Sequence, residues 1–178
     1  MNRLLLVTLL LAAAGSAAAA EPLQPVADLD INRYSGTWYE IARLPNRWQD
    51  RCVADITATY TPLQSGRIRV VNACRDKDGR MQSVTGQARR SADHPGKLKV
   101  RFAPAWLGWL PFVWADYWVL ALDPDYRWVI VGEPGRDYLW FLARDRALDR
   151  ATLDDLRARA TALGFDLDAL VVVSPPAD

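Results

Sequence analysis

Short runs in which apolar and polar residues alternate, separated by turn-forming residues, occupy most of the chain between residues 36 and 143. In residues 97–102 every second residue is apolar and the others are lysine or arginine, and residues 53–61 and 67–73 alternate similarly. A period of two predicts strands with one buried face and one wet face. The pattern predicts eight strands, at residues 36–44, 53–61, 67–73, 81–90, 97–102, 117–122, 127–131 and 138–143.

The last three runs are apolar on both faces, so another element must cover their outer side. Residues 149–164 predict that element as an amphipathic helix, capped by Asp149 and ended by Gly164. Its apolar stripe consists of Leu153, Leu156, Ala160 and Leu163. Residues 170–173 predict a short ninth strand at the edge of the sheet.

Eight strands at nearly regular spacing with tight turns indicate an all-β barrel or sandwich. The basic face of residues 97–101 argues against a barrel embedded in lipid, whose outward face must be apolar. The chain has 22 Lys and Arg against 21 Asp and Glu. This balance leaves no broad basic surface for nucleic acid or for an anionic membrane, and we exclude nucleic acid as a partner.

The first 20 residues have the layout of an export signal. A basic start at Arg3 precedes an apolar stretch at residues 4–14, and small residues follow up to Ala20. The apolar stretch is shorter than the roughly 20 residues that cross a bilayer. We expect cleavage after Ala20 and a single domain at residues 21–178.

Cys52 and Cys74 are the only cysteines. In an exported protein an even number favours a disulfide. Closing a loop of about twenty residues would stabilise the fold by about 3 kcal/mol in the chain-entropy model. A reactive thiol pair is the alternative.

Three motifs, in the same order and at the same strand positions, resemble the signatures of the lipocalin family. Gly36 and Trp38 match G-x-W at the first strand. Asp125 and Tyr126 resemble the end of T-D-Y between strands six and seven, with proline in place of the threonine. Arg144 ends the eighth strand where the family places an arginine that packs on the tryptophan, as a cation–π contact closing the barrel base.

This resemblance implies an eight-stranded antiparallel up-and-down β-barrel with one helix outside it and a short ninth strand. Residues 36–43, 137–140 and 164–166 are most similar to the bacterial and apolipoprotein-D-like branch, which implies a carrier of fatty acids, lysophospholipids or similar amphiphiles. Members of that branch often carry a lipoprotein cysteine after the leader, and none precedes Cys52 here. We therefore expect a soluble periplasmic or secreted protein, near the outer membrane, as a monomer or weak homodimer.

The alternation, with the phase of the last strands taken from the family, predicts which residues line the barrel interior. They are Ile56, Ala58, Tyr60, Val70, Asn72, Leu98, Val100, Phe102, Tyr117, Val119, Trp128, Ile130, Tyr138 and Trp140. The same side chains would equally fill a solid core, since a barrel of eight strands can be packed or can hold one ligand. Small residues such as Ala58 favour a cavity.

Four polar residues of the interior are candidates to orient a ligand head group: Glu40, Asn72, Tyr117 and Tyr138. Glu40 shares the phase of Trp38 and should point inward near the base. Burial would raise the pKa of its carboxyl, so that it can be neutral. Pairing with a neighbouring arginine or with water is the alternative.

Residues 104–114, between strands five and six, are unusually apolar for a loop at the open end of the barrel. Trp106, Trp109, Phe112 and Trp114 lie in this uncharged segment. It is either a lid or rim that touches a membrane while lipid enters, or a loop that packs back on the barrel or on a second subunit.

We expect a binding protein and not an enzyme, with no metal or other cofactor. His94 is the only histidine, which excludes the usual zinc sets and a Ser-His-Asp arrangement. Two alternatives remain. One is a lipocalin-fold enzyme that acts on a lipid, through a free thiol or paired acids, and the other is an envelope stress protein that scavenges damaged lipid.

Overall fold

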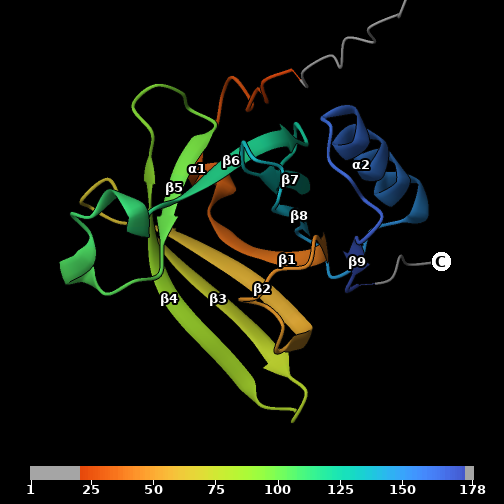
Figure 1. Cartoon of the computed structure of the whole chain (residues 1–178), viewed down its shortest axis with the longest axis horizontal. Coiled ribbons are helices and arrows are strands. Elements are labelled where there is room, and N and C mark those ends of the chain that lie inside the picture. Colours follow the sequence, from red (N-terminus) through yellow and green to blue (C-terminus); the bar gives the residue numbers. More distant parts are fainter. Residues whose placement is uncertain (1–20, 175–178) are drawn as a thin grey trace, which may run out of the picture.

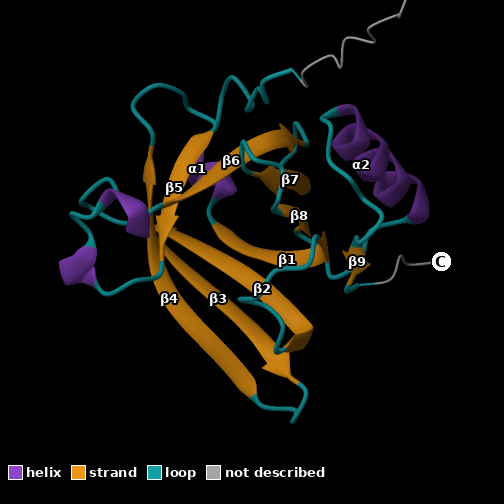
Figure 2. Cartoon of the chain, viewed as in Figure 1, coloured by secondary structure: helices purple, strands orange, loops and turns teal. Residues whose placement is uncertain are grey.

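The computed structural model describes residues 21–174, which form one antiparallel sheet curled into a barrel (Figures 1 and 2). Its strand order is β2-β3-β4-β5-β6-β7-β8-β1-β9, and pairing of β1 with β2 closes the barrel. The predicted leader at residues 1–20 lies outside the described residues and stays a prediction. The predicted fold class is confirmed.

The predicted strands and the predicted helix are all present, with ends that differ by a few residues. The strands are β1 (Gly36–Arg43), β2 (Cys52–Pro62), β3 (Ile68–Asp76), β4 (Met81–Arg90), β5 (Lys97–Arg101), β6 (Ala115–Leu122), β7 (Trp128–Gly132), β8 (Leu139–Ala143) and β9 (Val171–Val172). The helices are α1 (Ile31–Tyr34) and α2 (Arg150–Ala162), and the short 3-10 turns are η1 (Ala105–Leu107) and η2 (Pro111–Val113).

Two hydrophobic clusters lie on opposite sides of the barrel wall. The inner cluster includes Trp38, Tyr60, Val70 and Leu98 and fills the closed half of the interior. The outer cluster lies between α2 and β6–β8, where Leu156 is fully buried. Asp149 caps α2 as predicted, accepting a hydrogen bond from the backbone N–H of Thr152 at 2.8 Å. The helix covers the doubly apolar strands at one side of the barrel (Figure 1).

The phase predicted for β7 is wrong. Val129 and Val131 belong to the inner cluster, whereas Trp128 and Ile130 face outward into the cluster beneath α2. Strand β7 is buried on both faces, so no polar residue marks its outer face. Alternation therefore cannot reveal its phase. Val119 and Trp140, whose phase came from the same source, do lie on the inner side.

The wall between β1 and β2 is paired over only half its height. The register runs from Gly36 opposite Tyr60 to Tyr39 opposite Thr57, and the two strands then separate. At that point β2 contains register shifts, and Asp55 has a positive φ of 50°. The short strand β9 pairs instead with the free half of β1, with Ala42 opposite Val172.

No helix within residues 21–174 has the length and apolarity needed to cross a membrane.

The closed end of the barrel is covered by the extended segment before α1. Leu29 of this segment is 1% exposed and belongs to the inner cluster. The backbone N–H of Val26 donates to the carbonyl of Val119 at 2.8 Å, which ties the segment to β6.

Candidate ligand-binding site

Trp38 and Arg144 form the base of the barrel, as the sequence motifs predict. The guanidinium carbon of Arg144 lies 3.9 Å from the ring centroid of Trp38, and the indole is fully buried. Arg144 also donates hydrogen bonds to three backbone carbonyls near α1, those of Arg33, Ser35 and Thr37. Because the arginine both stacks and donates, it fixes α1 across the closed end.

The second motif contributes to the same end. The backbone N–H of Asp30 donates to the Tyr126 hydroxyl at 3.0 Å, and the Arg33 guanidinium lies over the Tyr126 ring at 4.2 Å. Asp125 is exposed, whereas the nearby Asp123 is buried and accepts the hydrogen bonds that hold this turn. The Asp123 carboxylate accepts two bonds from the Arg127 side chain, which lowers the pKa of Asp123.

Three tyrosine hydroxyls meet above this base. The Tyr117 hydroxyl lies 2.6 Å from that of Tyr34 and 2.8 Å from that of Tyr60. Burial raises the pKa of all three phenols, that of Tyr60 to about 12. Three hydroxyl protons serve two hydrogen bonds within this cluster, so one O–H is left to donate elsewhere. The Tyr117 hydroxyl, predicted as a head-group contact, is thus engaged with the other two phenols.

The interior towards the open end is apolar and partly exposed. Val84 continues the inner face of β4 through its register with Asn72 and is 47% exposed. Phe102 is 38% exposed. A Cβ atom at position 86 would lie 2.6 Å from Cδ1 of its ring, which is too close for two carbon atoms. A glycine is therefore required at position 86 for the ring to lie against the wall. The open half of the barrel therefore presents apolar surface that residues 21–174 leave uncovered.

A buried ion pair also lies on the interior face. In the β1–β8 register Glu40 is opposite Leu142 and Arg43 is opposite Trp140, both inward-facing positions. The Arg43 Nη1 donates to the Glu40 carboxylate at 2.7 Å, and the side chains are 9% and 4% exposed, respectively. Burial raises the pKa of Glu40, an effect that Arg43 opposes. The expected inward direction of Glu40 and the alternative of an arginine partner are both found.

The loop after β1 completes this polar group. The side-chain amide of Gln49 donates to Glu40 at 2.5 Å and accepts from the indole N–H of Trp140 at 2.8 Å and from Asn46 at 2.7 Å. Tyr138 stacks on Trp140 with ring centroids 6.1 Å apart. The network therefore joins β1, β8 and the loop between β1 and β2.

Two buried polar atoms on the interior side chains have no hydrogen-bond partner within residues 21–174: the Nε of Arg43 and the Oδ1 of Asn72. Buried polar atoms are normally paired in folded proteins, so each is a candidate contact for a ligand. Asn72 was predicted from the alternation. Arg43 was not, because a separation of three residues puts two side chains on opposite faces of a regular strand. A bulge between Glu40 and Ala42 brings both to one face.

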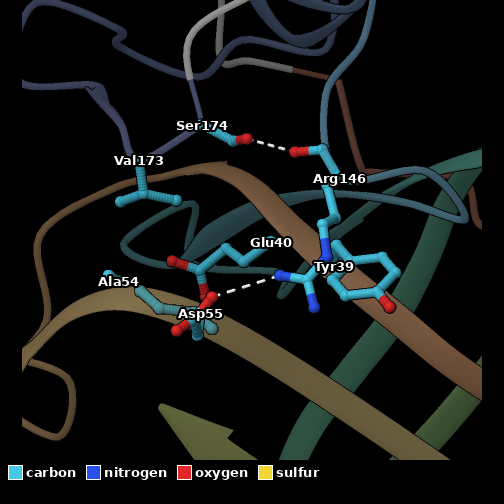
Figure 3. Close-up of a pocket in the computed structure, with 8 residues that line it drawn as sticks. Tyr39, Glu40, Ala54, Asp55, Arg146, Val173 and Ser174 are labelled. Carbon is cyan, nitrogen blue, oxygen red and sulfur yellow. Dashed lines mark hydrogen bonds and ion pairs between the residues drawn. The ribbon is translucent and has the colours of Figure 1, made fainter. Parts of the chain in front are cut away.

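Most of the other predicted lining residues lie on the inner side of the wall, whereas Trp128 and Ile130 lie on the outer side. Those buried in or packed against the inner cluster are Ala58, Tyr60, Val70, Leu98, Val100, Tyr117, Val119 and Trp140. Ile56 is buried and borders a cavity of about 210 Å³ where β1 and β2 separate. This cavity also contacts Tyr39, Arg146 and Ser174 (Figure 3). Arg146 crosses it to pair with Asp55 at 3.1 Å.

The aromatic loop between β5 and β6 projects away from the barrel (Figure 1). Trp106, Trp109 and Phe112 are 73%, 79% and 79% exposed, so these side chains do not pack back on the chain. The expected membrane contact is wrong for Trp114, which is buried. Its indole N–H donates to the carbonyl of Gly108, and its ring lies against the guanidinium of Arg89 at 4.4 Å.

Cys52 and Cys74 form the predicted disulfide, with their Cα atoms 5.5 Å apart. His94 lies in the turn between β4 and β5, at the closed end. Within residues 21–174 no group of three or more His, Cys, Asp or Glu side chains is arranged to hold a metal ion.

A lipocalin-like domain model matches residues 29–175. The chain is 38% identical to temperature-induced lipocalin-1 of Arabidopsis thaliana over 151 residues, 83% of this chain and 80% of that protein. It is 36% identical to the outer membrane lipoprotein Blc of Escherichia coli over 166 residues, 89% of each, and 34% identical to apolipoprotein D of Macaca fascicularis over 153 residues, 82% of this chain and 76% of that protein.

Among solved structures, insecticyanin from the tobacco hornworm Manduca sexta superposes with a TM-score of 0.65 at 19% identity, covering 86% of this chain and 85% of that one. This likeness supports the fold alone. The signature residues at the barrel base, the closed barrel with its outer helix and the sequence matches agree, and the chain belongs to the lipocalin family.

Proposed function

We propose that this protein binds one lipid-like amphiphile, a fatty acid or a lysophospholipid, in the barrel interior and carries or stores it in the bacterial cell envelope. The observation that carries the proposal is the uncovered apolar lining of the open half, at Val84 and Phe102. Exposed apolar surface inside a concave wall favours an apolar ligand, because the ligand removes that surface from water.

The disulfide supports a location outside the cytoplasm, since such bonds persist in oxidising compartments. The similarity to an outer membrane lipoprotein is consistent with the cell envelope. We propose a carrier and not an enzyme, because both cysteines are bonded to each other and the one histidine lies at the end of the barrel opposite the mouth. Neither can then act as a nucleophile or a base in the open half.

Contact with a lipid surface during loading is the second part of the proposal. Three aromatic side chains at the tip of the β5–β6 loop are more than two-thirds exposed, and aromatic residues favour the membrane interface. Arg89 is exposed and lies over the ring of Trp114, where its charge can meet anionic head groups. The loop joins the strand ends at the open mouth, so a lipid leaving the bilayer there would enter the barrel directly.

The test is a titration of the delipidated protein with oleate and with 1-oleoyl lysophosphatidylcholine, followed by tryptophan fluorescence. Native mass spectrometry gives the stoichiometry. Saturable one-to-one binding at about micromolar concentration or below supports the carrier. Absence of binding by both amphiphiles would refute it.

A further inference from the structure

The inward-facing Glu40–Arg43 pair is unusual in leaving one edge of its guanidinium unused. The Arg43 side chain makes one hydrogen bond, from Nη1 to Glu40, and its Nε has no partner within residues 21–174. The side chain is nevertheless only 9% exposed. Bulk solvent therefore reaches little of this side chain.

The direction of Arg43 is set by the backbone. The bulge after Glu40 places Arg43 opposite Trp140, whose ring packs against the inner cluster. The indole of Trp140 and the amide of Gln49 are bonded to each other, and Gln49 also holds Glu40. Glu40 is thus fixed on one side of Arg43 by two donors, and residues 21–174 supply no partner on the Nε side.

The chemistry of that edge selects the group. Nε and Nη2 present parallel N–H donors whose spacing matches the two oxygens of a carboxylate or a phosphate. A neutral hydroxyl supplies a single oxygen and no charge. The apolar surface at Val84 and Phe102 lies in the same interior and is suited to an alkyl chain.

We infer that the Nε–Nη2 edge of Arg43 binds the acidic head group, carboxylate or phosphate, of a single-chain amphiphile held in the barrel. This inference rests on the proposed carrier function and specifies its ligand class. Arg43 is then the residue that discriminates acidic from neutral lipids, and Glu40, Gln49 and Trp140 are positioning residues that hold its guanidinium in place.

The experiment compares oleate with oleyl alcohol, which has the same chain and a neutral head, by calorimetric titration of the delipidated protein. The expected result is that oleate binds at least about tenfold more tightly, as one charge-assisted bidentate contact would give. 1-Oleoyl lysophosphatidate should behave like oleate. Inorganic phosphate at millimolar concentration should not displace oleate, and displacement would show a site for free anions and overturn the assignment to an amphiphile.

The variant R43K tests the residue itself, because lysine keeps the charge beside Glu40 but lacks the two-donor edge. It should reduce the preference for oleate to about threefold or less. The matched control R69K, on the exposed outer face of β3, should retain the wild-type preference. An unchanged preference in R43K would show that the head group binds elsewhere.

The titration of the wild-type protein tests the preference for an acidic head group even if R43K folds poorly. Equal binding of oleate and oleyl alcohol would overturn the role of Arg43 and leave the carrier function standing. Binding of neither would refute the carrier function and this inference together. A ¹⁵N–¹H signal of an arginine Nε that shifts with oleate, does not shift with oleyl alcohol and is missing in R43K would locate the contact directly.

Discussion

Replacement of Arg144 by methionine should destabilise the barrel by about 3 kcal/mol. The guanidinium donates to the carbonyls of Thr37, Arg33 and Ser35 at 2.8, 2.7 and 2.9 Å. Two of these contacts are solvent-exposed, so about 0.5–1 kcal/mol each is appropriate, below the range for buried charged bonds. The stacking on Trp38 at 3.9 Å adds about 1 kcal/mol.

The assay is urea unfolding followed by far-UV circular dichroism, with an intact disulfide in every sample. At a slope of about 2 kcal/mol per molar urea, the midpoint should fall by about 1.5 M. Arg69→Met serves as the control, because this arginine is exposed on the outer face of β3. A midpoint for Arg144→Met within about 0.3 M of the control would refute the view that this arginine holds the closed end together.

Three further predictions concern stability and membrane contact. The double variant C52S/C74S should lose about 3 kcal/mol, since the disulfide spans 22 residues, and an unchanged urea midpoint would contradict the entropic account. The difference in tyrosinate absorbance between wild type and Y60F should have its midpoint near pH 12, because burial raises the pKa of Tyr60 to about 12. Because burial favours the neutral phenol in the folded state, Tyr60 contributes about 3 kcal/mol to the free energy of unfolding. This contribution is complete below pH 10 and is lost as the pH rises towards 12. A titration midpoint near pH 10 would be inconsistent with burial of the phenol. The variant W109S/F112S should bind anionic vesicles several-fold more weakly than wild type, as measured by co-sedimentation, whereas V171S on β9 should not differ from wild type; equal binding by all three would remove the loop from the loading step.

The sequence predicts one half of the barrel wall better than the other, for a physical reason. Strands β2, β3 and β5 have water on their outer face, so polar residues mark it and the inward positions of Ala58, Val70 and Leu98 follow. Strands β6–β8 lie beneath α2, so both faces are apolar and the phase is lost. This loss accounts for the wrong inward placement of Trp128 and Ile130.

The polar part of the site depends on backbone irregularity, which alternation does not reveal. Glu40 and Arg43 share a face only because of the bulge between them, so Arg43 was missed although it lies in the same strand as the signature residues Gly36 and Trp38. Gln49 reaches Trp140 across 91 residues, and a polar loop residue carries no signal of such a contact. Trp114 was misjudged because composition alone does not distinguish the buried aromatic of the loop from its three exposed neighbours.

The short strand β9 covers a backbone edge of β1 that β2 leaves unpaired. Where β2 turns away, the carbonyl of Ile41 accepts from the backbone N–H groups of Val173 and Ser174, and Ala42 pairs with Val172. Without residues 171–174 that part of β1 would be an open strand edge, able to recruit the same strand of another molecule. A two-residue strand thus shields the barrel against edge-to-edge aggregation, and removal of this segment should produce oligomers before it produces unfolded protein.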